Sequence, residues 1–225
     1  MTSDPLNAAM TTSEMTALPE KGIALLERLR AKTARVGVIG LGYVGLPLAV
    51  TAASRGNPVT GFEIDPEKIA DLEAGTSYIA AVSQEALNNV RNKTFDWSAD
   101  FSGLKRCDVI VICVPTPLSS HREPDLSYVE STSRTIASYL TPETLVVLES
   151  TTYPGTADDV MTPILEESGL RAGQDFFVAS SPEREDPGNT SFHTATIPKI
   201  VGGDGEMASL LAQQFYGGVV DRVVP

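Results

Sequence analysis

The sequence predicts a doubly wound α/β protein, with a mostly parallel sheet and helices on both faces. Two observations indicate this class. Short runs that are apolar throughout alternate with helix-like segments along the chain, and such strands are typical of a parallel sheet that is covered on both sides. The first run leads directly into the glycine-rich stretch VGVIGLGYVGLPLA, residues 36–49, where Rossmann-like folds place a phosphate-binding turn.

The bulk properties limit the function classes. The 225 residues suit one large domain, or one domain with attachments. The formal net charge of −12 argues against nucleic acid and anionic membranes as partners. No apolar run approaches the ~20 residues of a membrane span, and the N-terminus lacks the basic start of a signal peptide. We therefore expect a cytoplasmic protein.

The first half of the chain begins with a polar segment that we interpret as a flexible tail, residues 1–18. The domain proper is expected over residues 19–225 and opens with a short amphipathic helix at 19–33. The pattern then predicts strands at 35–40 and 57–65 and helices at 43–56 and 66–75. Residues 77–106 are less regular, and we predict a helix and a small excursion there.

The second half continues the alternation. The pattern predicts strands at 107–115, 144–150, 174–182, 198–203 and 218–225, and helices at 125–140, 156–169 and 205–216.

The glycine turn has the context that a phosphate site requires. A strand precedes it and a helix follows it. Gly40 allows the tight turn, Gly42 lets a pyrophosphate approach the backbone, and Gly45 lets the helix lie close to the sheet. The unpaired N–H groups at the helix start then attract the phosphates, and we expect Tyr43 and Val44 to contact the same ligand.

An acidic residue follows the second predicted strand. Glu63 stands eighteen residues after Gly45, about where a carboxylate accepts hydrogen bonds from the adenosine ribose. An acid there repels a 2′-phosphate, which favours NAD over NADP. Asp65 is the rival for this role, but it would equally cap the helix that starts at Pro66.

The remaining reactive side chains carry simpler interpretations. Cys107 and Cys113 lie six positions apart in one predicted strand, too far to form a disulfide, and we expect buried thiols. His121 and His193 have no pattern for a metal site or a nucleophile relay, so no metal is predicted.

Several ordered segments resemble one enzyme family. With the glycine turn placed, VICVPTPL, PDLSYVESTSRTIA, LESTTYPGT, SSPEREDPGN and PKIVGG follow in the order seen in the UDP-glucose/GDP-mannose dehydrogenase family. The resemblance spans residues 34–225, and the SPEREDPGN wording is most similar to the UDP-N-acetylglucosamine 6-dehydrogenases. It implies oxidation of the C6 alcohol of a UDP-sugar to a carboxylate, with two NAD and a covalent cysteine thioester.

The resemblance also implies cofactor contacts. Val114, Pro115 and Thr116 would border the NAD at a strand end, where ligands of open parallel sheets gather. Thr151 would lie near the nicotinamide and hold a water or the developing alkoxide. The plain alternative is that Ser150 and Thr151 cap the next helix. Lys68 would approach the adenosine. The alternative is that Lys68 is a solvated cation on the helix surface.

A further acid matches the family's carboxylate used in proton transfer. Glu183 could orient or deprotonate water, if burial raises its pKa, and a surface-loop acid is the alternative. Arg184 could pair with Glu183 or with an acidic substrate group. The UDP-glucose branch carries a second glutamate four residues later, where this chain has Pro187. That task is absent or falls to Glu185 or Asp186.

The family's reactive cysteine, with the lysine and asparagine that precede it, lies beyond Pro225, in the family's central helical and C-terminal substrate domains. We therefore expect NAD binding without turnover by these residues alone, and a homo-oligomer for the longer form. The alternatives are a stand-alone NAD-binding module without catalysis, another UDP-hexose as substrate (UDP-glucose or UDP-N-acetylmannosamine), and a 3-hydroxyacid dehydrogenase. The acid-rich SPEREDPGN segment argues against the last.

Overall fold

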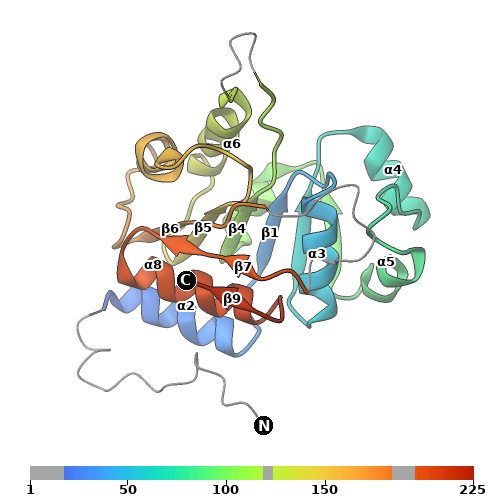
Figure 1. Ribbon diagram of the computed structural model, residues 1–225, viewed down its shortest axis with the longest axis horizontal. Coiled ribbons are helices and arrows are strands. Elements are labelled where there is room, and N and C mark those ends of the chain that lie inside the picture. Colours follow the sequence, from blue (N-terminus) through green and yellow to red (C-terminus); the bar gives the residue numbers. More distant parts are fainter. Residues whose placement is uncertain (1–17, 119–123, 184–195) are drawn as a thin grey trace.

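The computed structural model describes residues 18–118, 124–183 and 196–225. Within these residues seven strands form one sheet, in the order β3-β2-β1-β4-β5-β6-β8 (Figure 1). In chain order these strands are β1 (Val36–Ile39), β2 (Val59–Phe62), β3 (Phe95–Ser98), β4 (Val109–Ile112), β5 (Thr144–Leu148), β6 (Phe176–Ser180) and β8 (Gly202–Gly203).

The sheet has the doubly wound topology that the sequence predicts. Each pair from β3 to β6 is parallel, whereas β8 runs antiparallel to β6 at the edge. Strand β1 pairs with β2 on one side and β4 on the other, so the order reverses between β1 and β4. A crevice opens at such a point, beyond the carboxyl ends of the strands. A separate parallel pair joins β7 (Lys199–Ile200) to β9 (Val223–Val224).

Helices cover both faces of the sheet (Figure 1). One core cluster joins the sheet to α2, α3, α4, α5 and α8, and the other joins it to α6, α7 and a 3₁₀-helix. The helices are α2 (Glu20–Arg30), α3 (Gly45–Ser54), α4 (Pro66–Ala74), α5 (Gln84–Val90), the 3₁₀-helix (Phe101–Arg106), α6 (Ser127–Ala137), α7 (Thr162–Glu166) and α8 (Gly205–Gly217).

Alternate residues of the strands enter opposite cores. In β4, Val109 and Val111 belong to one cluster while Ile110 and Ile112 belong to the other. A strand that is apolar at every position follows from this two-sided burial, because successive side chains point to opposite faces. None of the described helices is long and apolar enough to span a membrane.

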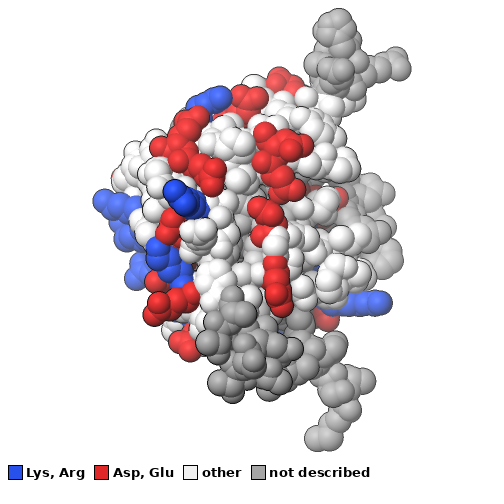
Figure 2. Space-filling view, turned by 90° about the vertical axis from the view of Figure 1, so that its left-hand side faces the viewer, with Lys and Arg blue, Asp and Glu red and all other residues white. Residues whose placement is uncertain are grey.

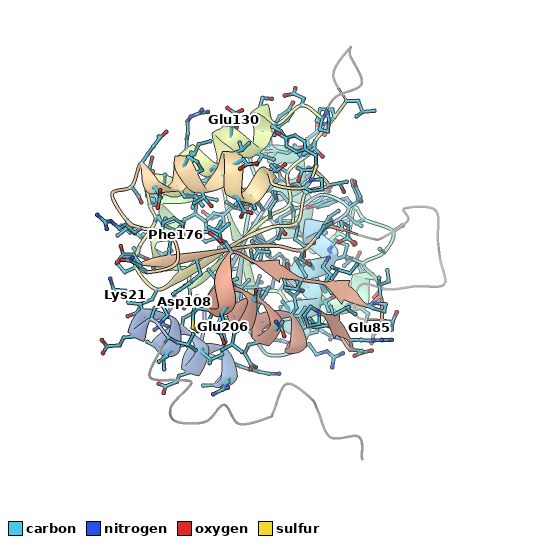
Figure 3. The ribbon with its side chains drawn as sticks, turned by 60° about the vertical axis from the view of Figure 1, so that its left-hand side comes forward. Lys21, Glu85, Asp108, Glu130, Phe176 and Glu206 are labelled. Atoms are coloured by element: carbon cyan, nitrogen blue, oxygen red, sulfur yellow. The ribbon has the colours of Figure 1, made fainter. Side chains whose placement is uncertain are left out.

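The N-terminal helix α2 lies beside α8 on one face of the sheet (Figure 1). Its apolar side buries Leu25, Leu26 and Leu29. Its polar side pairs with residues next to the strands: Lys21 with Asp175, and Arg28 with Asp108 at 3.0 Å and with Glu143 at 2.7 Å. Lys21 and Asp108 are both labelled in Figure 3.

The fold confirms the predicted class and corrects some elements. The segment 77–106, where a helix and a small excursion were expected, contains helix α5 and also strand β3, which the pattern did not predict because Asp96 and Ser98 interrupt the apolar run. The helix expected over 156–169 is a π-helix, Thr156–Met161, followed by the short α7. The last predicted strand, 218–225, is reduced to the two residues of β9. The expected tail lies outside the described residues, apart from residue 18.

The turn after β1 brings the start of helix α3 very close to the end of the strand. Gly40 has φ +86°, which favours glycine. A Cβ on Gly45 would lie 1.9 Å from the carbonyl oxygen of Gly40, whereas a Cβ on Gly42 would meet no atom within 4 Å. Gly45 therefore serves packing, and the space at Gly42 is left open.

We predict that Gly45→Ala destabilises the protein by about 3 kcal/mol, because the methyl group overpacks a rigid backbone contact. Gly42→Ala is the matched control and should stay close to the wild-type free energy of unfolding. Urea denaturation of both variants measures this difference. Equal stability of the two variants would contradict the assigned packing role of Gly45.

Candidate functional site

A cleft of about 1160 Å³ opens at the carboxyl ends of the parallel strands. Its size is slightly above the roughly 300–1,000 Å³ typical of small-molecule sites. The cleft brings together most of the residues predicted from the sequence. Those that line it are Gly40, Gly42, Tyr43, Val44, Glu63, Lys68, Val114, Pro115, Thr116, Thr151 and Glu183.

The glycine turn forms one wall of this cleft. None of the described side chains caps the start of α3. The N–H of Leu46 donates to the carbonyl oxygen of Gly42 at 3.1 Å and Pro47 has no N–H, so the donors left for a ligand are the N–H groups just before Leu46. Tyr43, which is 59% exposed, extends beside this helix start. Tyr78, which sequence reasoning missed, donates its hydroxyl to the carbonyl oxygen of Leu41 at 2.9 Å and braces the turn. Gly45 lies beneath the wall and does not line the cleft.

Glu63 is held in place by several donors. It accepts hydrogen bonds from the backbone N–H of Leu41 at 2.9 Å, from those of Ile64 and Asp65, and from Lys68 Nζ at 3.2 Å. Burial acts to raise its pKa, but these donors outweigh burial and the net pKa is lowered. Glu63 is therefore an ionised acceptor. Its ion-pair partner Lys68 is one-third exposed, so a ligand can take the place of Lys68 at the carboxylate.

Asp65 has a different place from Glu63. Its carboxylate accepts a hydrogen bond from the backbone N–H of Glu67 at 2.9 Å, as the N-cap of α4. This is the capping role that the sequence offered as an alternative. Lys68 is likewise not a fully solvated cation, because its ammonium forms an ion pair with Glu63 at 3.2 Å.

Two strand ends are joined across the floor of the cleft. Thr116 donates its hydroxyl to the carbonyl oxygen of Thr151 at 2.7 Å, and Ser150 donates to the carbonyl oxygen of Val114 at 2.7 Å. The π-helix that follows starts at Thr156 with Gly155 as its N-cap and has no side-chain cap. The alternative in which Ser150 and Thr151 cap that helix is thus wrong.

A buried charge cluster, defined here as Glu149, Glu183, Lys199 and Tyr216, borders the cleft through its two acids. Lys199 Nζ is 2.6 Å from Glu149 Oε2 and 2.9 Å from Glu183 Oε2. Tyr216 donates to Glu149 Oε1 at 2.5 Å. The side chains of Lys199, Glu149 and Glu183 are 4%, 0% and 11% exposed. Glu183 is consequently a buried, paired acid and not the surface-loop acid of the alternative interpretation.

The cluster shifts its own ionisation. Desolvation raises the pKa of Glu149 to about 7, against the attraction of Lys199. Desolvation also lowers the pKa of Lys199, but Glu149 and Glu183 outweigh it and leave that pKa above the ordinary value. Lys199 is thus a cation shared by two carboxylates, one of which titrates near neutral pH.

Sequence reasoning missed Glu149, Lys199 and Tyr216. A signal was present, because Glu149 directly follows the apolar run TLVVL and Lys199 precedes the apolar pair at 200–201. A charged residue inside a buried pattern requires a partner. The pairing itself joins residues 50 and 67 positions apart, which one sequence does not reveal.

The thiols behave as expected. Both cysteines are free and buried, and burial raises the pKa of Cys107 to about 12 and that of Cys113 well above its ordinary value. Among the described residues no group of His, Cys, Asp and Glu could hold a metal ion. Arg184, Glu185, Asp186, Pro187, His121 and His193 lie outside the described residues, so the expectations for them are not addressed.

These features define a dinucleotide-binding Rossmann domain: a parallel sheet, a glycine turn at its switch point, and an acid after the second strand. The chain belongs to the UDP-glucose/GDP-mannose dehydrogenase family, whose NAD binding domain matches residues 34–220. This family assignment confirms the resemblance noted from the sequence and establishes NAD as the cofactor of the domain.

Individual relatives agree with this assignment. The chain is 35% identical to a UDP-N-acetyl-D-glucosamine 6-dehydrogenase of Pseudomonas aeruginosa, covering 84% of this chain and 44% of that protein. It is 39% identical to a UDP-N-acetyl-D-mannosamine dehydrogenase of Pyrococcus horikoshii, covering 83% and 45%.

A solved structure of an NDP-N-acetyl-D-galactosaminuronic acid dehydrogenase from Methanosarcina mazei superimposes with a TM-score of 0.82 at 34% identity, covering 91% and 46%. The chain spans less than half the length of these relatives.

The raised pKa of Glu149 makes a prediction for stability. The folded protein retains a proton on Glu149 between pH 4.5 and about 7, where the unfolded chain has released it. Stability should therefore fall as pH rises through this window. The groups that face Glu149 are Lys199, Glu183, Tyr216 and Cys113.

We expect the free energy of unfolding to decline by roughly 2 kcal/mol more in the wild type than in Glu149→Gln between pH 5 and pH 8. Chemical denaturation at several pH values measures this difference. Parallel pH profiles for the two proteins would show that Glu149 does not retain its proton.

Proposed function

We propose that this chain is the NAD-binding half of a nucleotide-sugar 6-dehydrogenase. The complete enzyme would oxidise the C6 alcohol of UDP-N-acetylglucosamine, or of a related UDP-hexose such as UDP-N-acetylmannosamine, to a carboxylate. The observation that carries the proposal is the open space at Gly42 beside the uncapped start of α3. We expect a pyrophosphate to fit there, because none of the described side chains caps the helix start.

The residues of the cleft would divide the cofactor between them. The turn Gly40–Gly45 holds the pyrophosphate, and Glu63 with Lys68 holds the adenosine ribose. Ribose hydroxyls would share Glu63 with Lys68, its exchangeable partner. Val114, Pro115 and Thr116 border the path toward Thr151. When bound there, NAD would supply the hydride acceptor, and two NAD molecules in succession would serve the two oxidations.

Thr151 and Glu183 are the proposed catalytic groups. Thr151 lines the cleft, and its backbone carbonyl oxygen accepts a hydrogen bond from Thr116. The hydroxyl would therefore hold a water or the developing alkoxide. Glu183 would orient or deprotonate the hydrolytic water.

The acidic surface seen in Figure 2, where Asp and Glu form bands over one face, fits a protein that takes its anionic ligand through backbone donors. We further propose that the enzyme is cytoplasmic and homo-oligomeric.

Calorimetry of this chain with NAD and with NADP tests the cofactor site. We expect NAD to bind and NADP to bind at least about tenfold more weakly, because a 2′-phosphate would lie beside the ionised Glu63. Asp65→Asn is the control and should leave the ratio unchanged, since Asp65 caps α4. Equal affinities for NAD and NADP would remove the Glu63 assignment.

Turnover tests the whole proposal. This chain would be continued by the C-terminal half of the Pseudomonas aeruginosa relative, and NADH formation with UDP-N-acetylglucosamine recorded at 340 nm. We expect Thr151→Ala to lower kcat about 100-fold, as loss of one stabilising donor does. This variant keeps the backbone oxygen that Thr116 requires.

A folded chimera that binds NAD but forms no NADH with any UDP-hexose would favour a non-catalytic binding module. UDP-N-acetylmannosamine and UDP-glucose are the substrates to compare.

A further inference from the structure

The buried charge cluster joins four separate parts of the fold. Glu149 follows β5, Glu183 follows β6, Lys199 begins β7 and Tyr216 lies on α8. The backbone N–H of Glu183 also donates to the carbonyl oxygen of Glu149 at 3.2 Å. The cluster therefore fixes the ends of two adjacent parallel strands where they meet the cleft.

Lys199 has a fixed position within this cluster. Its backbone N–H donates to the carbonyl oxygen of Arg222 at 2.9 Å, and β7 pairs with β9. Its ammonium lies 5.8 Å from the centre of the Tyr216 ring, a favourable place for a cation. Because its backbone is hydrogen-bonded and its side chain is only 4% exposed, Lys199 is a rigid partner for the two carboxylates.

The two carboxylates differ in their relation to the cleft. Both line it, but Glu149 is fully buried and bound by Tyr216, whereas the side chain of Glu183 retains 11% exposure. Glu183 is thus the member that a ligand can reach. Without a shared cation, two carboxylates this close would repel each other.

We propose that Lys199 is a positioning residue: it holds the Glu183 carboxylate at the wall of the cleft, while Glu149 and Tyr216 hold Lys199. This inference rests on the proposed function, since it assigns Glu183 a task on the bound substrate. It gives Lys199, Glu149 and Tyr216 a role in holding Glu183, and none of these three residues needs to touch a reacting atom.

A purely structural role makes a different prediction. If Lys199 only neutralised Glu149 in the core, removing both charges together would leave Glu183 where it is. If Lys199 positions Glu183, the same double change keeps the fold but releases the Glu183 carboxylate. Single removal of Lys199 leaves Glu149 and Glu183 without their cation and is expected to impair folding, so the double variant carries the test.

The experiment compares wild type, Lys199→Met/Glu149→Gln and Lys199→Arg as the full 225-residue chain. Crystal structures locate the Glu183 carboxylate, and calorimetry records the affinity for NAD. We expect the double variant to fold and bind NAD within about threefold of wild type, with the carboxylate displaced from the cleft wall. Lys199→Arg should keep the carboxylate in place, because a guanidinium can pair with both acids.

A kinetic cycle in the chimeric dehydrogenase gives the functional readout. We expect the double variant to lower kcat about as much as Glu183→Gln, with KM for NAD unchanged and no additional loss when the changes are combined. Lys199→Arg should keep kcat close to the wild-type value.

An unmoved Glu183 carboxylate in the double variant, or losses in kcat that add, would overturn the positioning role. Failure of wild type to bind NAD would instead overturn the proposed function. A double variant that does not fold would also contradict the inference, because it would show that the cluster serves the core itself.

Discussion

The contact of Gly45 with the carbonyl oxygen of Gly40 is the constraint on which the cleft depends. It brings the start of α3 against the ends of β1 and β4, where the strand order reverses. None of the described side chains caps that helix, and the space beside Gly42 is open. Because the backbone supplies the donors at this turn, a chain of net charge −12 can hold an anionic cofactor without a basic patch.

A second constraint is the buried charge cluster, whose two acids line the same cleft. Taking Lys199 and two carboxylates out of water is costly, and close pairing offsets that cost only with good geometry. Tyr216 and the sheet provide this geometry. The site therefore has one wall built from glycine and a helix terminus, and another built from ion pairs that unite four elements.

The sequence was sufficient for the fold class and for the cofactor wall, because both follow from local patterns. The all-apolar strands and the spacing of Gly40, Gly42 and Gly45 are readable within a few residues of one another. Glu149 and Lys199 were missed, since their meaning depends on contacts between distant segments. Strand β3 was missed for a related reason: it is a half-buried edge strand, and its polar residues resemble those of a loop.

Helix α2 lies before the region that the family shares, which begins at residue 34. Nevertheless Leu25, Leu26 and Leu29 belong to the same core as α8 and the sheet. The folded domain therefore extends at least one helix beyond the residues that the family model matches. A shortened form starting at residue 34 would expose the apolar surface of α8 that α2 covers, and it should therefore self-associate.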